Sequence, residues 1–136
     1  MEHFSYLHST QPNKVKALRE ELERPKMFAR VWRGVTKKAD ADAFFEYMKK
    51  TGVKDLYAMK GNQGILVLKR ERARGKHVEF ILMSLWESLD SIRRFAGDDI
   101  EKAYYPYPED EKYLLKLEPK TAIYEVPISL IKPEPT

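Results

Sequence analysis

The side chains that could do chemistry in this sequence are few, because the most reactive types are absent or poorly placed. The 136 residues include no cysteine and only three histidines. Without cysteine there is no thiolate nucleophile and no cysteine-bound zinc or iron–sulfur centre. The histidines are His3 and His8 near the start of the chain and His77 beside a predicted turn. We therefore expect neither histidine acid–base catalysis nor a multi-histidine metal site.

Two clusters of charge have simple structural explanations. The acidic pair Asp98–Asp99 follows a predicted helix end, where carboxylates favour the start of a further helical turn, and two adjacent carboxylates alone bind metal weakly. The basic run from Lys69 to Lys76 is interrupted by a glutamate and is typical of an exposed hairpin tip. We therefore predict no metal site and no nucleic-acid partner.

Composition indicates an ordinary globular protein. Hydrophobic residues make up 43% and charged residues 34% of the chain, which is enough for one domain with a two-layer core. The longest apolar run, FILMSLW, has the length of a strand and is far shorter than the roughly 18 residues of a membrane helix. The first ten residues show no signal-peptide pattern. We expect a cytoplasmic protein with no membrane partner.

The first 26 residues differ in pattern from the rest. Val15, Leu18 and Leu22 have helical spacing, which predicts an amphipathic helix that Asn13 can cap and that Pro25 ends. We therefore divide the chain into an N-terminal extension, residues 1–26, and a domain of residues 27–136.

Alternating and helical patterns follow one another in the domain. The predicted strands are residues 28–35, 65–72, 77–86 and 121–130. The predicted helices are residues 39–52, closed by Gly52, residues 88–97, capped by Ser88 and ended by Gly97, and a short helical stretch at 98–105. The order β-α-β-β-α-β predicts an α+β, ferredoxin-like fold with an antiparallel four-stranded sheet and helices on one face.

Both faces of the predicted sheet are apolar. Along the strand at 77–86, one side carries Phe80, Leu82 and Trp86, and the other carries Ile81, Met83 and Leu85. Helices can cover only one of these faces, so we predict that the other is buried against a second copy of the chain in a homodimer.

Several stretches resemble one known family. ARVWRG, TGVKDLYAMKGNQGILVLKR, the segment from LMSLWES to KLEP, and YEV are similar to the dimeric α/β-barrel superfamily, in its antibiotic-biosynthesis-monooxygenase-like branch. The resemblance covers about residues 27–127. It implies pairing as a dimeric α/β barrel, with a ligand pocket between helices and sheet. Activities in the superfamily include cofactor-free oxygenation of aromatic polyketides, heme degradation and isomerisation, so the resemblance alone does not decide the function.

The heme-degrading members use an asparagine, a tryptophan and an axial histidine at places that fall on Val31, Phe95 and Tyr105. All three residues differ here, which removes the usual imidazole ligand of the iron and disfavours heme degradation. Many relatives also have a histidine just before YEV, where this chain has Ile123.

The resemblance leaves cofactor-free oxygenation, which needs a pocket that positions an electron-rich aromatic compound and favours its deprotonated form. Arg33 could hold an anionic oxygen, and Tyr104, Tyr105 and Asn62 could donate hydrogen bonds. The pocket candidates are Val31, Arg33, Asn62, Trp86, Phe95, Tyr104 and Tyr105. Each has an alternative structural role, for example an ion pair of Arg33 with a glutamate, or Trp86 as a core plug.

The sequence therefore predicts a homodimer that acts, without metal or cofactor, as a monooxygenase on a small aromatic or hydrophobic compound. The alternative is a non-enzymatic binding or sensor protein that uses the same pocket. RNA-recognition domains share the strand order, but the aromatic residues Phe80 and Trp86 are too far apart for their base-stacking pattern, so RNA binding is not expected.

Overall fold

The structure is a computed structural model that describes residues 12–23 and 26–133. Contacts within the chain separate residues 27–125 as one compact unit from the remaining residues. Outside that unit, α2 (Pro12–Leu22) is a helix without a buried residue, and it already includes Asn13, which was predicted to cap it. The predicted stop at Pro25 and the histidines His3 and His8 lie outside the described residues.

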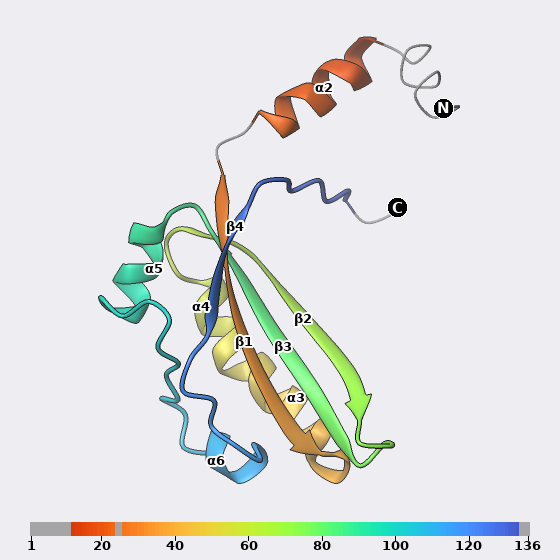
Figure 1. Cartoon of the computed structure of the whole chain (residues 1–136), viewed down its shortest axis with the longest axis vertical. Helices are drawn as coiled ribbons and strands as arrows, with labels where there is room; N and C mark the ends of the chain where they lie inside the picture. The colour runs from red at the N-terminus through yellow and green to blue at the C-terminus, as the bar shows by residue number, and fades with distance from the viewer. Residues whose placement is uncertain (1–11, 24–25, 134–136) are drawn as a thin grey trace. The chain divides into compact units, whose positions relative to one another are not determined.

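The compact unit is built on one antiparallel sheet (Figure 1). Its strands are β1 (Met27–Lys37), β2 (Asn62–Arg72), β3 (His77–Trp86) and β4 (Ala122–Val126). They lie in the order β2-β3-β1-β4, which confirms the predicted ferredoxin-like α+β fold. β3 pairs with both β1 and β2, and Trp32 of β1 lies opposite Leu82.

The helices after β1 and β3 lie at the predicted places, but the helices at Gly52–Tyr57 and Asp110–Tyr113 were not predicted from the sequence. The helical elements are a 3₁₀ turn η1 (Lys38–Asp40), α3 (Ala41–Lys50), α4 (Gly52–Tyr57), α5 (Leu89–Ala96) and α6 (Asp110–Tyr113). Gly52 begins α4 instead of closing the preceding helix, so the prediction for that residue was wrong. A capping box, in which the Ser88 side chain accepts from the Ser91 backbone N–H, starts α5 as predicted.

The predicted helical stretch at 98–105 is not a helix. Arg30 explains the difference, because its guanidinium donates hydrogen bonds to the backbone carbonyls of Ile100 and Lys102. In a helix these carbonyls would accept from N–H groups four residues further along the chain. Ile100 and Glu101 instead lie in a turn, and Lys102 pairs with Lys120 just before β4.

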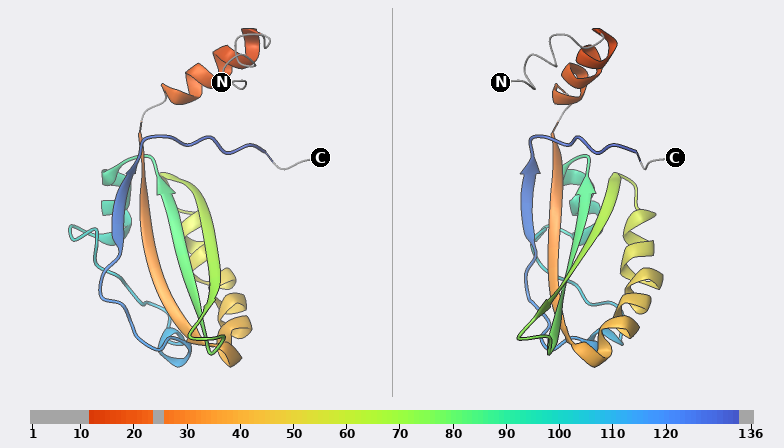
Figure 2. Two further views of the ribbon diagram at one scale, coloured as in Figure 1. Left: turned by 45° about the vertical axis from the view of Figure 1, so that its right-hand side comes forward. Right: turned by 90° about the vertical axis from the view of Figure 1, so that its right-hand side faces the viewer.

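The helices of this unit cover one face of the sheet, called here the inner face (Figure 2). Two clusters of buried side chains lie between the layers, one centred on Phe44 of α3 and Phe80 of β3, the other on Trp86 and Ile92 of α5. The opposite, outer face carries Val31 of β1, Met83 of β3 and the exposed Leu66 of β2. This agrees with the sequence pattern, which makes both faces apolar.

Candidate functional site

A cavity of about 120 Å³ lies between the inner face of the sheet and the helices. Its walls come from β1, β3, α3, α4, α5, the loop before α6 and α6 itself. An engineered apolar cavity of about 150 Å³ holds a benzene molecule, so this space fits roughly one aromatic ring. The charged residues that line it are Arg30, Asp55 and Asp110.

Arg30 lies on the inner face of β1, between Phe28 and Trp32, and is only 7% exposed. Its guanidinium carbon lies 5.1 Å above the ring centre of Phe95. That ring in turn stacks on Trp86, with centres 5.7 Å apart and planes 8° from parallel. The hydrogen bonds to two backbone carbonyls and this stacked support fix the guanidinium in place.

No carboxylate of the described residues pairs with Arg30. Burial lowers the pKa of its guanidinium, although arginine remains charged in proteins. A buried cation without a counter-charge is costly, and a bound anion would offset that cost. The cavity therefore offers a preformed place for an anionic oxygen.

Asp110 is the buried carboxylate of the cavity, with 9% exposure. Burial raises its pKa to about 6. Burial raises the pKa values of Tyr47, Tyr105 and Tyr107, and the negative charge of Asp110 adds to each of these shifts. Among the described residues, none gives its carboxylate a hydrogen bond or an ion pair.

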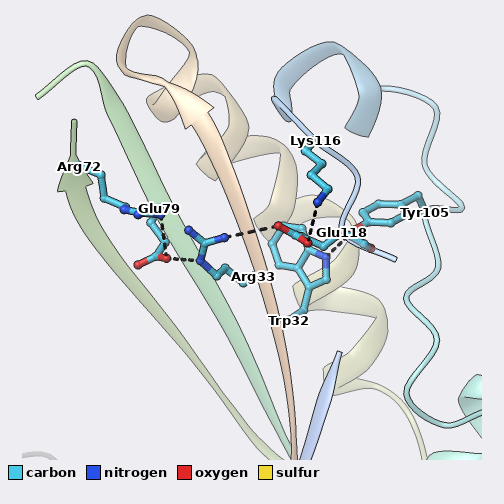
Figure 3. A network of polar contacts seen from close by, with 7 residues as sticks. All are labelled: Trp32, Arg33, Arg72, Glu79, Tyr105, Lys116 and Glu118. Carbon is cyan, nitrogen blue, oxygen red and sulfur yellow. Dashed lines mark hydrogen bonds and ion pairs between the residues drawn. The ribbon is translucent and has the colours of Figure 1, made fainter. Parts of the chain in front are cut away.

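A hydrogen-bond chain joins the cavity wall to the edge of the sheet (Figure 3). The indole N–H of Trp32 donates to the Tyr105 hydroxyl over 3.0 Å, and that hydroxyl donates to the Glu118 backbone carbonyl over 2.6 Å. Gly34 makes room for the indole, because a Cβ there would lie 2.2 Å from the Trp32 ring. The orientation of this wall is therefore fixed by packing as well as by hydrogen bonds.

Asp55 of α4 is exposed and accepts a hydrogen bond from the Tyr107 hydroxyl. Burial and this carboxylate raise the pKa of Tyr107, so its hydroxyl stays protonated and keeps the contact. This pair ties α4 to the loop before α6 beside the cavity. The Asp55 carboxylate thus accepts a side-chain hydrogen bond, whereas the Asp110 carboxylate accepts none from the described residues.

Three of the seven predicted pocket residues line the cavity: Phe95, Tyr104 and Tyr105. Trp86 lies behind Phe95 as a fully buried core residue whose indole N–H donates to Ser84 Oγ. Asn62 begins β2 away from the cavity, where its side-chain oxygen accepts from the Gly64 N–H.

Val31 and Arg33 lie on the outer face of β1, so they do not line the cavity. The Arg33 guanidinium is held by Glu79 and Glu118, and Arg72 also reaches Glu79 (Figure 3). This is the ion-pair alternative that the sequence left open for Arg33. Burial alone would raise the pKa of Glu79, but hydrogen bonds from Arg70 and Arg33 outweigh burial and hold it below its usual range.

The sequence interpretation missed the two charged groups that mark the site. Arg30 had a signal, because it alternates with Phe28 and Trp32 and so belongs to the core face of its strand. A cation on a core face is rare and is a reason to expect a function. Asp110 had no comparable signal, since it stands in a charged, proline-flanked stretch that reads as surface.

Within residues 12–23 and 26–133, no helix has the length and apolar character needed to cross a membrane. In the same residues, no three histidine, aspartate or glutamate side chains converge in a way that could hold a metal ion.

Comparison with known proteins supports the fold. No protein-family model and no curated protein matches the sequence. The chain is similar to the structure of a candidate antibiotic biosynthesis monooxygenase from Bacillus cereus, with a TM-score of 0.52, 17% identity, and coverage of 78% of this chain and 98% of that one. The chain is also similar to the structure of a candidate antibiotic biosynthesis monooxygenase from Nitrosomonas europaea. That comparison has a TM-score of 0.49 and 16% identity, and it covers 74% of this chain and 88% of that one.

The likeness to the Bacillus cereus structure shows the fold of this chain. The chain has the ferredoxin-like fold of the antibiotic-biosynthesis-monooxygenase-like proteins, with its cavity between the helices and the sheet. The resemblance that the sequence predicted is thus confirmed at the level of the fold.

Proposed function

We propose that the protein is a cofactor-independent monooxygenase of the antibiotic-biosynthesis-monooxygenase-like family, acting on a small electron-rich aromatic compound. The observation that carries this proposal is a ring-sized cavity, walled by aromatic and apolar side chains, that contains a buried arginine without a counter-charge. Such a site favours the anion of a phenol or enol over its neutral form.

The chemistry needs no external reductant. The bound phenolate passes an electron to dioxygen, and the two radicals combine at a ring carbon conjugated with the oxyanion. The resulting peroxide loses the hydrogen of that carbon and one oxygen atom as water, which leaves a quinone carbonyl. The aromatic compound supplies all four electrons, one oxygen atom enters the product and the other becomes water.

The residues of this chain supply binding and electrostatics for that reaction. Arg30 would hold the oxyanion, and the rings of Phe95 and Trp32 would contact the faces and edge of the substrate. The Tyr105 hydroxyl, fixed between the Trp32 N–H and a backbone carbonyl, would keep that wall in one orientation. Preorganised groups of this kind lower the barrier because they need no rearrangement as charge develops.

A dioxygen assay tests the proposal. The purified protein, with a metal chelator present, is mixed with a panel of single-ring dihydroxyarenes, and oxygen uptake is recorded beside product mass after incubation with ¹⁸O₂. Uptake with one labelled atom in a quinone product is expected. A compound that binds in the cavity but consumes no dioxygen across the panel would instead favour the alternative function, a non-enzymatic binding or sensor protein.

We also propose that the protein is a homodimer paired through the outer face of the sheet. The exposed Leu66 and Leu68 and the half-buried Met83 give this face an apolar surface that water would otherwise contact. Light scattering during size-exclusion chromatography should give twice the chain mass for the wild type. Leu66→Glu should give a monomer, while Tyr57→Glu, which changes an exposed residue of α4 on the opposite layer, should stay dimeric.

A further inference from the structure

We infer that Asp110 accepts the proton of the substrate hydroxyl, and that the ligand is a single aromatic ring with a hydroxyl at one end and an anionic oxygen at the other. This inference deepens the proposed function and rests on it for the reaction. The binding that it implies can be measured without turnover.

The first support is the placement of the two charges. Arg30 and Asp110 line the same cavity but are surrounded by different elements. Arg30 contacts Phe95 of α5 and the carbonyls of the 98–105 segment, whereas Asp110 lies among tyrosines of α3 and the loop before α6. The cation and the carboxylate are therefore contributed by different elements of one ring-sized cavity, so a single ligand can contact both.

The second support is that neither charge has a counter-charge among the described residues. The other lining carboxylate, Asp55, receives the Tyr107 hydroxyl. The buried carboxylate of the outer face, Glu79, is surrounded by arginines. Within the described part of the chain, the Asp110 carboxylate receives neither a hydrogen bond from a hydroxyl nor an ion pair with an arginine. An unpartnered polar group beside a cavity is a position where a ligand donor gains a strong hydrogen bond.

The proton balance is simple. The ligand O–H bond breaks, its electron pair stays on the ligand oxygen, and the proton moves to a carboxylate oxygen of Asp110. The phenolate charge is then delocalised through the ring toward Arg30. When the peroxide later collapses, the protonated carboxyl returns its proton to the departing oxygen, and the residue is restored as a carboxylate.

Three phenols beside Asp110, those of Tyr47, Tyr105 and Tyr107, do not titrate in the same range. Burial, with a contribution from the charge of Asp110, raises the pKa values of Tyr47, Tyr105 and Tyr107, so these phenols remain protonated between pH 5 and pH 7.5. The other ionisable groups nearby are Asp55 of α4, beyond Tyr107, and Tyr113 and Glu109 at α6. The pKa of Asp110 is about 6, in the middle of this range.

The test compares 4-hydroxybenzoate with benzoate by isothermal titration calorimetry. Both carry a carboxylate for Arg30, and they differ only in the hydroxyl that Asp110 would receive. At pH 7.5, 4-hydroxybenzoate should bind the wild type about tenfold more tightly than benzoate, the size expected for a hydrogen bond to a charged group. At pH 5, where Asp110 is largely protonated, this advantage should shrink to about twofold.

Two variants complete the comparison. Asp110→Asn should lose most of the hydroxyl advantage at pH 7.5 and all of its pH dependence. Glu109→Gln removes the same charge from the neighbouring exposed residue, so it should behave like the wild type. If Asp110→Asn does not fold, the two-ligand comparison at two pH values in the wild type still decides the question.

An equal hydroxyl advantage in every variant and at both pH values would overturn the inference, as would the absence of binding by either compound. Failure of the proposed function gives a different result. In that case the hydroxyl advantage and its pH dependence remain, but no compound of the dihydroxyarene panel consumes dioxygen.

Discussion

Replacing Asp110 should stabilise the protein at neutral pH. The pKa of its carboxyl is raised by burial from 3.8 to about 6, so the folded chain holds this proton more tightly than the unfolded chain. Its stabilising contribution is therefore present at low pH and is lost as the pH rises from 3.8 through 6. Asp110→Asn, which is neutral at every pH, should be free of that loss.

The magnitude follows from the shift. About two pKa units correspond to about 3 kcal/mol at 1.36 kcal/mol per unit. Because the carboxylate faces a cavity that solvent reaches, screening reduces this to roughly 1–2 kcal/mol. We expect Asp110→Asn to raise the free energy of unfolding by that amount at pH 7.5 and by much less at pH 4.5.

Urea unfolding followed by circular dichroism measures this difference. The variants can be compared when their free energies of unfolding fall with urea concentration at the same slope. Glu109→Gln is the matched control and should leave the wild-type pH dependence unchanged. Glu79 does not interfere, because its pKa is lowered and its own contribution is lost only at more acidic pH. If Asp110→Asn is less stable than the wild type at pH 7.5, or if its free energy of unfolding depends on pH as that of the wild type does, the ionised Asp110 carboxylate does not destabilise the folded chain.

Three further changes test the structure around the cavity. Gly34→Ala would place a Cβ 2.2 Å from the Trp32 ring, so overpacking should cost about 1–3 kcal/mol and change tryptophan fluorescence; unchanged thermal unfolding would contradict the packing described. Tyr105→Phe leaves the Trp32 N–H without its acceptor and should cost about 1–3 kcal/mol in urea unfolding, whereas an indifferent variant would mean that the hydrogen bond is unimportant. Ser88→Ala removes the cap of α5 and should cost about 1 kcal/mol, and a loss below a few tenths would show that the cap contributes little.

Much of the fold could be predicted from the sequence because its signals are local. Alternation along β1 and β3 identifies strands and assigns each side chain to a face, which the observed pairing of Trp32 with Leu82 obeys. The start of α5 at Ser88 and its end at Gly97 follow from cap chemistry alone. Strand order then follows from short connections between neighbouring elements.

The prediction failed where a distant residue competes with local preference. Ile100, Ala103 and Tyr104 have the spacing of a helix, but the carbonyls of Ile100 and Lys102 accept hydrogen bonds from Arg30, about seventy positions earlier. No pattern within 98–105 reveals that donor. The same long-range contact also brings Tyr104 and Tyr105 to the cavity.

The candidate site was only partly predictable, because the sequence does not show which charged side chains pair with one another in the fold. Arg33 was chosen from the sequence as the anion-binding residue, and Arg30, three residues earlier on the opposite face, was not. The two are the same residue type in the same strand, but Arg33 is held by two glutamates while Arg30 has only backbone carbonyls as partners. Composition and spacing cannot show which cations are already neutralised.

The pairing of charges also argues for where a ligand belongs in this fold. On the outer face, Glu79 is surrounded by Arg33, Arg70 and Arg72, so a further ion there would have to displace an existing partner. In the cavity, Arg30 and Asp110 are each buried without a counter-charge, which destabilises the folded chain when no ligand is bound. A ligand that satisfies both groups would relieve both costs at once. The same two residues should therefore account for binding, and Asp110 should account for the stability that the chain gains when that carboxylate is replaced.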